Sequence, residues 1–322
     1  MNKEDLRIVY MGTPEFAVES LKRLVEGGYN VVGVVTMPDK PMGRHGSVLQ
    51  LSAVKQYALS KGLRVLQPVR LKDEAFVNEL RELHADLQIV VAFRMLPEVV
   101  WAMPRLGTFN VHASLLPQYR GAAPINWAVI HGDTETGVTT FFLRHEIDTG
   151  EIIAQVRVPI ADTDCAGDVY DRLMLTGADL TVKTVDQILD GTVKSVPQEA
   201  CTIDEPLRPA PKIFRETCRI DWSCGVKSVY DFVRGLSPHP AAWTELSCGG
   251  STPVVMKVYQ TGKEFCAHDL PVGTVETDGA TYLRVAVSDG FVRLLSVQLS
   301  GKKRMPAADF LRGFRMRDAV VI

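Results

Sequence analysis

Short apolar runs alternate with helical stretches over the first two-thirds of the chain. The apolar runs are rich in β-branched residues and predict strands over residues 6–11, 31–36, 64–66, 87–92, 108–112 and 137–143. Helices are expected between them, over residues 15–26, 51–61, 72–83 and 122–131. Near-continuous apolar strands separated by helices are typical of a parallel sheet that is covered on both faces. The pattern therefore predicts a Rossmann-like α/β domain with a mostly parallel sheet.

The last third of the chain has a different pattern. A long helix is predicted over residues 164–189, and prolines at 197, 206, 209 and 211 then indicate a linker over about residues 190–213. After a further helix at residues 226–236, short strands with turn signals are expected at 253–259, 273–277, 282–287 and 292–297. Such strands in a short segment predict a small, OB-like β-barrel. We expect a catalytic domain of residues 1–206 and a barrel domain of residues 207–322.

Charge is distributed unevenly between these two parts. The whole chain carries 36 Lys+Arg and 38 Asp+Glu, a formal net charge of −2. Residues 1–206 hold 20 basic and 27 acidic residues, whereas residues 207–322 hold 16 and 11. A basic domain joined to an acidic one suggests that the basic domain meets a polyanion, although a solvated surface alone could also account for it.

Several classes of protein are disfavoured by what the sequence lacks. The six cysteines form no Cys-x-x-Cys pair, so we expect neither a metal site nor a disulfide framework. Gly12-Thr13-Pro14 replaces the Gly-x-Gly-x-x-Gly loop of dinucleotide-binding domains, and there is no P-loop motif. No apolar run is long enough to span a membrane, and the acidic N-terminus does not resemble a signal peptide. These features predict a cytoplasmic protein that does not bind membranes.

A polar cluster follows the predicted strand at residues 108–112. The two-residue period of a strand places Asn110 and His112 on the same side, at the carboxyl end where open α/β sheets bind ligands. An amide and an imidazole that project together can hydrogen-bond the oxyanion of an acyl transfer. Asp148 follows the next predicted strand and could lie against His112, orient it and accept a proton. The residues alone permit this chemistry, because His112 could also be an ordinary buried polar residue and Asp148 part of a turn.

The same residues carry a resemblance to a known family. The motifs are Asn110-x-His112-x-Ser114-Leu115-Leu116-Pro117, Tyr119-Arg120-Gly121-Ala122-Ala123-Pro124 and Ile147-Asp148-Thr149-Gly150. Together they resemble the folate-dependent formyltransferases, and further matching segments extend over nearly the whole chain.

The resemblance implies a reaction and a set of roles. A formyl group would pass from 10-formyltetrahydrofolate to the amino group of initiator methionyl-tRNA, with no metal. Asn110 and His112 would stabilise the oxyanion, and Asp148 would orient His112 and manage the amine proton. The segment made of Ser114, Leu115, Leu116 and Pro117 would contact the folate, and residues 90–96 would form a wall of the same pocket.

Contacts with the tRNA are implied at two places. Arg44 lies in a glycine-containing loop, and Lys302, Lys303 and Arg304 form a basic cluster in the second domain. We expect the enzyme to act as a monomer. Two alternatives stay open: a formyltransferase of the same fold that acts on a sugar-nucleotide amine, and a non-enzymatic nucleic-acid-binding protein. Asn110, His112 and Asp148 would form a catalytic triad, and this triad argues against the second alternative. The basic second domain argues against the first.

Overall fold

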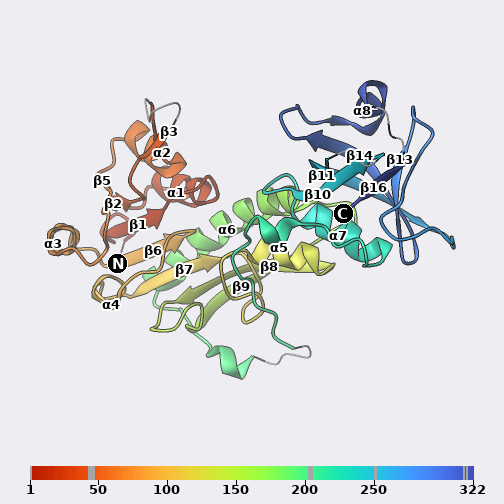
Figure 1. Cartoon of the computed structure of the whole chain (residues 1–322). Helices are drawn as coiled ribbons and strands as arrows, with labels where there is room; N and C mark the ends of the chain where they lie inside the picture. Colours follow the sequence, from red (N-terminus) through yellow and green to blue (C-terminus); the bar gives the residue numbers. More distant parts are fainter. Residues whose placement is uncertain (1, 43–47, 202–205, 250–251, 315, 317) are drawn as a thin grey trace. The chain divides into compact units, whose positions relative to one another are not determined.

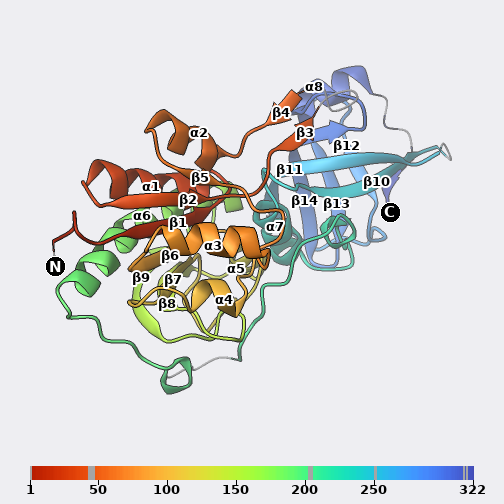
Figure 2. The same cartoon turned by 90° about the vertical axis from the view of Figure 1, so that its left-hand side faces the viewer.

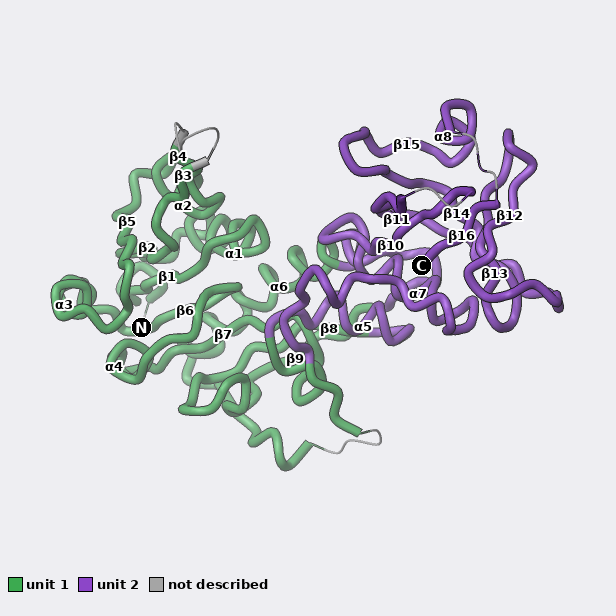
Figure 3. Tube along the Cα trace, in the orientation of Figure 1, with its two compact units in different colours: residues 1–121, 136–158, 170–209 green, residues 122–135, 159–169, 210–322 purple. Residues whose placement is uncertain are grey.

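A computed structural model describes the chain except for residues 1, 43–47, 202–205, 250–251, 315 and 317 (Figure 1). The chain forms two compact units that are interleaved in sequence (Figure 3). Unit 1 comprises residues 1–121, 136–158 and 170–209, and unit 2 comprises residues 122–135, 159–169 and 210–322. The predicted division at residues 206/207 stays a prediction.

Unit 1 is built on a seven-stranded, mostly parallel sheet, which confirms the predicted fold class. The strand order is β5-β2-β1-β6-β7-β8-β9. The strands are β1 (Ile8–Gly12), β2 (Val31–Val35), β5 (Val65–Leu66), β6 (Leu87–Val91), β7 (Thr108–His112), β8 (Glu135–Phe142) and β9 (Ile152–Pro159). The pairs from β5 to β7 are parallel, and β8 runs antiparallel to β7. Strand β7 therefore lies between two partners, where its backbone is fixed on both sides.

Helices flank this sheet. The helices are α1 (Phe16–Glu26), α2 (Ala53–Ser60), α3 (Glu74–Glu82), α4 (Glu98–Trp101) and α6 (Ala166–Leu189), which runs on from unit 2. Val9 and Met11 of β1 pack with α3 and α4 on one face, whereas Tyr10 between them donates a hydrogen bond from its hydroxyl to the Ala17 carbonyl of α1 (2.5 Å). This alternation is what the strand period requires. Strands β3 (Lys40–Met42) and β4 (Val48–Gln50) form a separate antiparallel pair (Figure 2).

Unit 2 contains an antiparallel sheet whose order is β12-β13-β14-β11-β10-β16, with β15 paired to β14. Its strands are β10 (Ala242–Cys248), β11 (Val254–Phe265), β12 (Val275–Thr277), β13 (Leu283–Val287), β14 (Gly290–Leu299), β15 (Met305–Pro306) and β16 (Ala319–Val321). A bridge between Thr274 and Val320 joins the two edges of the sheet. The sheet is therefore a nearly closed barrel, as the sequence predicts.

The helical parts of unit 2 are α5 (Pro124–Ile130), α7 (Val226–Gly235) and α8 (Ala307–Gly313). Short 3₁₀ turns cover Gln198–Ala200 in unit 1 and Glu216–Cys218 in unit 2. Helices α5 and α7 pack closely enough for the Asn126 amide to donate to the Gly235 carbonyl (2.8 Å). A Cβ at Gly235 would lie 2.5 Å from the Ile130 side chain, so glycine at this position allows α5 and α7 to pack closely.

Candidate active site

Strand β7 carries the first two residues of the predicted triad. Asn110 and His112 occupy alternate positions of this strand, and Val111 between them faces Gly177 of α6 on the opposite side. Asn110 is half-buried. The shared face confirms the geometry expected from the strand period.

His112 is buried and held in one orientation. Its Nε2 lies 2.9 Å from the Tyr119 carbonyl oxygen, and its ring meets the Phe141 ring edge to face. A carbonyl oxygen only accepts hydrogen bonds, so Nε2 carries the proton. In the neutral imidazole this leaves Nδ1 with its lone pair, and Nδ1 is the nitrogen that faces Asp148.

Asp148 stands beside His112, an arrangement that the sequence pattern permits but does not require. Its Oδ2 lies 4.0 Å from His112 Nδ1 and accepts a hydrogen bond from the Gly121 backbone N–H (3.0 Å). The residue adopts a left-handed backbone conformation with φ of 55°, which aspartate tolerates better than most side chains. The turn is closed by a hydrogen bond from the Thr149 hydroxyl to the Glu146 carbonyl (3.1 Å). The carboxylate is thus fixed close to the imidazole.

Gly150 closes this loop against strand β8. A Cβ at this position would lie 1.6 Å from the Phe142 carbonyl oxygen, which is backbone and cannot rotate away. We expect Gly150→Ala to lower the free energy of unfolding by about 3 kcal/mol, because the loop must leave β8. Urea unfolding measures this. Gly177→Ala is the matched control, since its Cβ would meet Val111 and Val138 at ordinary packing distances of 3.4–4.0 Å. Equal stability of the two variants would contradict the argument.

The four residues predicted to contact folate form a tightly held turn after β7. The Ser114 hydroxyl donates to the Gln118 carbonyl (2.7 Å), and the Leu116 N–H donates to the Thr139 hydroxyl (3.1 Å). Ser114, Leu116 and Pro117 are buried and Leu115 is half-buried. The segment directly follows His112, so it borders the triad, and its contact with folate stays a prediction.

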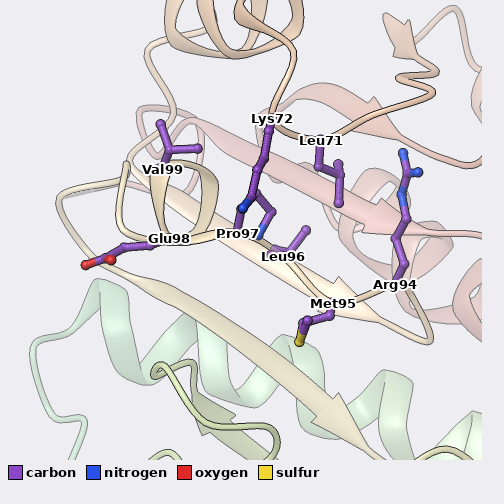
Figure 4. Close-up of a pocket in the computed structure, with 8 residues that line it drawn as sticks. All are labelled: Leu71, Lys72, Arg94, Met95, Leu96, Pro97, Glu98 and Val99. Carbon is purple, nitrogen blue, oxygen red and sulfur yellow. The ribbon is translucent and has the colours of Figure 1, made fainter.

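Residues 90–96 are predicted to form a pocket wall. Arg94, Met95 and Leu96 line one side of a pocket of about 540 Å³, whose other lining residues are Leu71, Lys72, Pro97, Glu98 and Val99 (Figure 4). The Arg94 guanidinium donates to the carbonyl oxygens of Pro68 and Val69, and its burial lowers the pKa of the group. Arg94 therefore stiffens the edge of this pocket. That folate occupies it stays a prediction.

The predicted tRNA-binding residues lie elsewhere. Lys302, Lys303 and Arg304 are exposed in the loop after β14 of unit 2. The Arg304 Nε donates to the Ser296 hydroxyl (2.9 Å), and its guanidinium lies over the Tyr259 ring at 4.4 Å. Arg44 lies outside the described residues.

Among the residues that the structure describes, no three His, Cys, Asp or Glu side chains are grouped so that they could hold a metal ion. No helix in the same residues is long and apolar enough to cross a membrane.

The chain thus combines an α/β sheet and a small barrel. Strand β7 of the sheet carries an amide and an imidazole, and the loop after β8 brings a carboxylate to within 4.0 Å of the imidazole. The family model described as formyl transferase matches residues 6–185, and the model of the formyl transferase C-terminal domain matches residues 212–315. The chain belongs to the formyl transferase family.

The chain is also similar to methionyl-tRNA formyltransferases over nearly its whole length. The chain is 72% identical over 319 residues to a methionyl-tRNA formyltransferase of Phocaeicola vulgatus, covering 99% of this chain and 98% of that protein. It is 51% identical to the protein of the same name from Porphyromonas gingivalis, with both chains fully covered.

Solved structures share the fold. An N-formyltransferase from Helicobacter canadensis, in complex with folinic acid and dTDP-3-aminofucose, superposes with a TM-score of 0.64 at 20% identity. That match covers 90% of this chain and 98% of the other. HypX from Aquifex aeolicus, in complex with tetrahydrofolic acid, gives a TM-score of 0.61 at 18% identity, covering 95% of this chain and 47% of HypX.

Proposed function

We propose that this chain transfers the formyl group of 10-formyltetrahydrofolate to the free amino group of initiator methionyl-tRNA, for translation initiation. The observation that carries the proposal is the 72% identity to a methionyl-tRNA formyltransferase, because it extends over both compact units. The amino-sugar ligand of the Helicobacter protein belongs to a relative of only 20% identity, which shares the fold alone. The relatives therefore favour methionyl-tRNA over a sugar nucleotide as the acceptor.

The geometry of Asn110, His112 and Asp148 supports the chemistry that we propose for them. When the amine nitrogen attacks the formyl carbon, a carbon–nitrogen bond forms and the carbonyl electrons move to oxygen. Asn110 donates its amide N–H to that oxyanion, and His112 donates through Nδ1 in its protonated form, since Nε2 is engaged by the Tyr119 carbonyl. Asp148 stabilises the imidazolium and takes up the proton lost by the amine. Collapse of the intermediate breaks the bond to the folate nitrogen, which leaves with a proton.

The test combines the purified chain, 10-formyltetrahydrofolate and charged initiator tRNA. Mass spectrometry of the released amino acid should show formylmethionine, with none formed when the tRNA is uncharged. A dTDP-amino sugar in place of the tRNA serves as the competing acceptor. Formylation of the amino sugar, with none of the methionyl-tRNA, would contradict the proposed acceptor.

We propose that separate sets of residues contact the two substrates. Ser114, Leu115, Leu116 and Pro117 contact the folate, whereas Arg44 and the cluster of Lys302, Lys303 and Arg304 contact the tRNA. We assign the enzyme a monomeric state and a cytoplasmic location, with residues 207–322 as its tRNA-binding domain. Arginine suits such contacts because its planar guanidinium donates in two directions and stacks on bases.

Removing the basic cluster should weaken the dependence of tRNA binding on salt. Each cation that neutralises a phosphate releases counterions, so the slope of log affinity against log salt should fall by about 1 for each such cation removed. The variant replaces Lys302, Lys303 and Arg304 by alanine, and binding is measured across a salt series.

A control variant should remove as many cations from unit 1. The exposed or half-buried side chains of Lys22, Lys61 and Arg64 pair with acidic neighbours there, so their replacement by alanine should leave the slope unchanged. Equal slopes for the wild type and the Lys302, Lys303 and Arg304 variant would remove this cluster from the tRNA-binding surface.

A further inference from the structure

Gln198 is a fully buried polar side chain beside the candidate active site that the reaction itself does not use. It lies in the 3₁₀ turn Gln198–Ala200, in the segment that follows α6, and only 1% of its surface is exposed. Mutual hydrogen bonds between the backbones of Ile152 and Val196 (2.9 and 2.8 Å) attach this segment to the start of β9. The attachment places Gln198 next to the loop that carries Asp148.

The amide of Gln198 makes four hydrogen bonds. Its Nε2 donates to the carbonyl oxygens of Asp148 and Gly150, both at 2.8 Å. Its Oε1 accepts from Nε and Nη2 of Arg120, at 3.0 and 2.7 Å. Carbonyl oxygens only accept and a guanidinium only donates, so these partners fix which end of the amide is oxygen. No charged or apolar side chain can satisfy both ends in this way.

The four bonds connect the two loops that meet at Asp148. Arg120 lies in the loop after β7, directly before Gly121, whose N–H holds the Asp148 carboxylate. Asp148 and Gly150 lie in the loop after β8. Gln198 therefore holds the main chain of Asp148, while the Gly121 N–H holds its carboxylate. Gln198 also restrains Arg120, the residue next to Gly121.

We propose that Gln198 is a positioning residue for formyl transfer, one that sets the distance between the Asp148 carboxylate and His112. The proposal rests on the proposed catalytic role of Asp148. Asp148 Oδ2 lies 4.0 Å from His112 Nδ1, which is beyond hydrogen-bond distance, so a small displacement of the loop decides whether the two groups can bond. Asp148 also sits in a left-handed conformation that the loop must hold in place. Displacement of a reacting group by about 1 Å can cost about 100-fold in rate.

The decisive variant is Gln198→Glu, which keeps the shape and the acceptor for Arg120 but replaces the donor by an oxygen that faces two carbonyl groups. We expect kcat to fall by about 100-fold while KM for both substrates is unchanged, because substrate contacts are not touched. Gln198→Met keeps the length of the side chain without a charge, and it gives the same measurement if the carboxylate prevents folding. Gln88→Leu is the matched control, since Gln88 is a buried glutamine of β6 whose amide nitrogen has no partner among the described residues. Its kcat should equal that of the wild type.

A double-mutant cycle separates positioning from general stability. If Gln198 acts through Asp148, Gln198→Glu should cost no more than about twofold in kcat in an Asp148→Asn background, because the two effects are not additive. A wild-type kcat for Gln198→Glu, a rise in KM alone, or a full additional loss in the Asp148→Asn background would each overturn the proposal. Failure of the proposed triad gives a different result, in which Asp148→Asn and His112→Ala themselves keep wild-type activity.

Discussion

His112→Ala should lose about 10²–10³ in the single-turnover rate of formyl transfer. The substitution removes the imidazole that we assign to the oxyanion, and Asn110 on the same face of β7 cannot replace it. The measurement is a single-turnover assay with saturating folate and methionyl-tRNA, because it isolates the chemical step from product release.

The variant needs a control for stability, since His112 is buried and its replacement removes the hydrogen bond from Nε2 to the Tyr119 carbonyl. The unfolding transition of the variant should therefore be measured alongside its rate. His145→Ala is the matched control, because that side chain is 74% exposed and pairs with Glu98. A well-folded His112→Ala protein that transfers the formyl group at the wild-type rate would exclude His112 from the reaction.

Asp148→Asn should impair the reaction by at least about 100-fold. Asparagine also tolerates the left-handed backbone conformation found here, and its amide oxygen can still accept from the Gly121 N–H. The change therefore removes the negative charge and the ability to accept a proton while it preserves the loop. The same single-turnover assay, repeated across a range of pH, measures its effect.

The pH profile gives this prediction a second readout. Loss of the carboxylate should change the dependence of the rate on pH, because the group proposed to take up the amine proton is gone. An unchanged rate and an unchanged profile in Asp148→Asn would show that the charge has no part in the chemistry. The residue would then only shape the loop.

The pattern of apolar and polar residues along the chain is sufficient to predict the sheet of unit 1. It also predicts that Asn110 and His112 lie on the same face of one strand. Strands β1 and β6 are buried, mostly apolar runs, and such runs have few alternatives to a central parallel strand. The same period places Asn110 and His112 on one face. The predicted helices at residues 51–61 and 72–83 correspond to α2 and α3, with ends shifted by a few residues.

Elements at sheet edges are harder to predict. The sequence pattern does not predict β9, because it is an edge strand in which exposed and half-buried residues alternate with few buried ones. It also misses β10, and β11 extends to Phe265, well beyond the predicted end at residue 259. Such strands form because they pair with neighbours that are remote in sequence, and their own residues show only a weak preference.

The sequence by itself determined the class of fold, the barrel that follows it and the pair of Asn110 and His112, since these depend on local periods of two and 3.6 residues. Only the tertiary structure decided that Asp148 Oδ2 approaches His112 Nδ1, and that Tyr119 fixes the proton of the imidazole. It alone decided that Gln198, from a segment predicted to be a linker, restrains the Asp148 loop. These interactions join residues 7 to 50 positions apart, and contacts of that kind are set by where the chain packs, which no local pattern records.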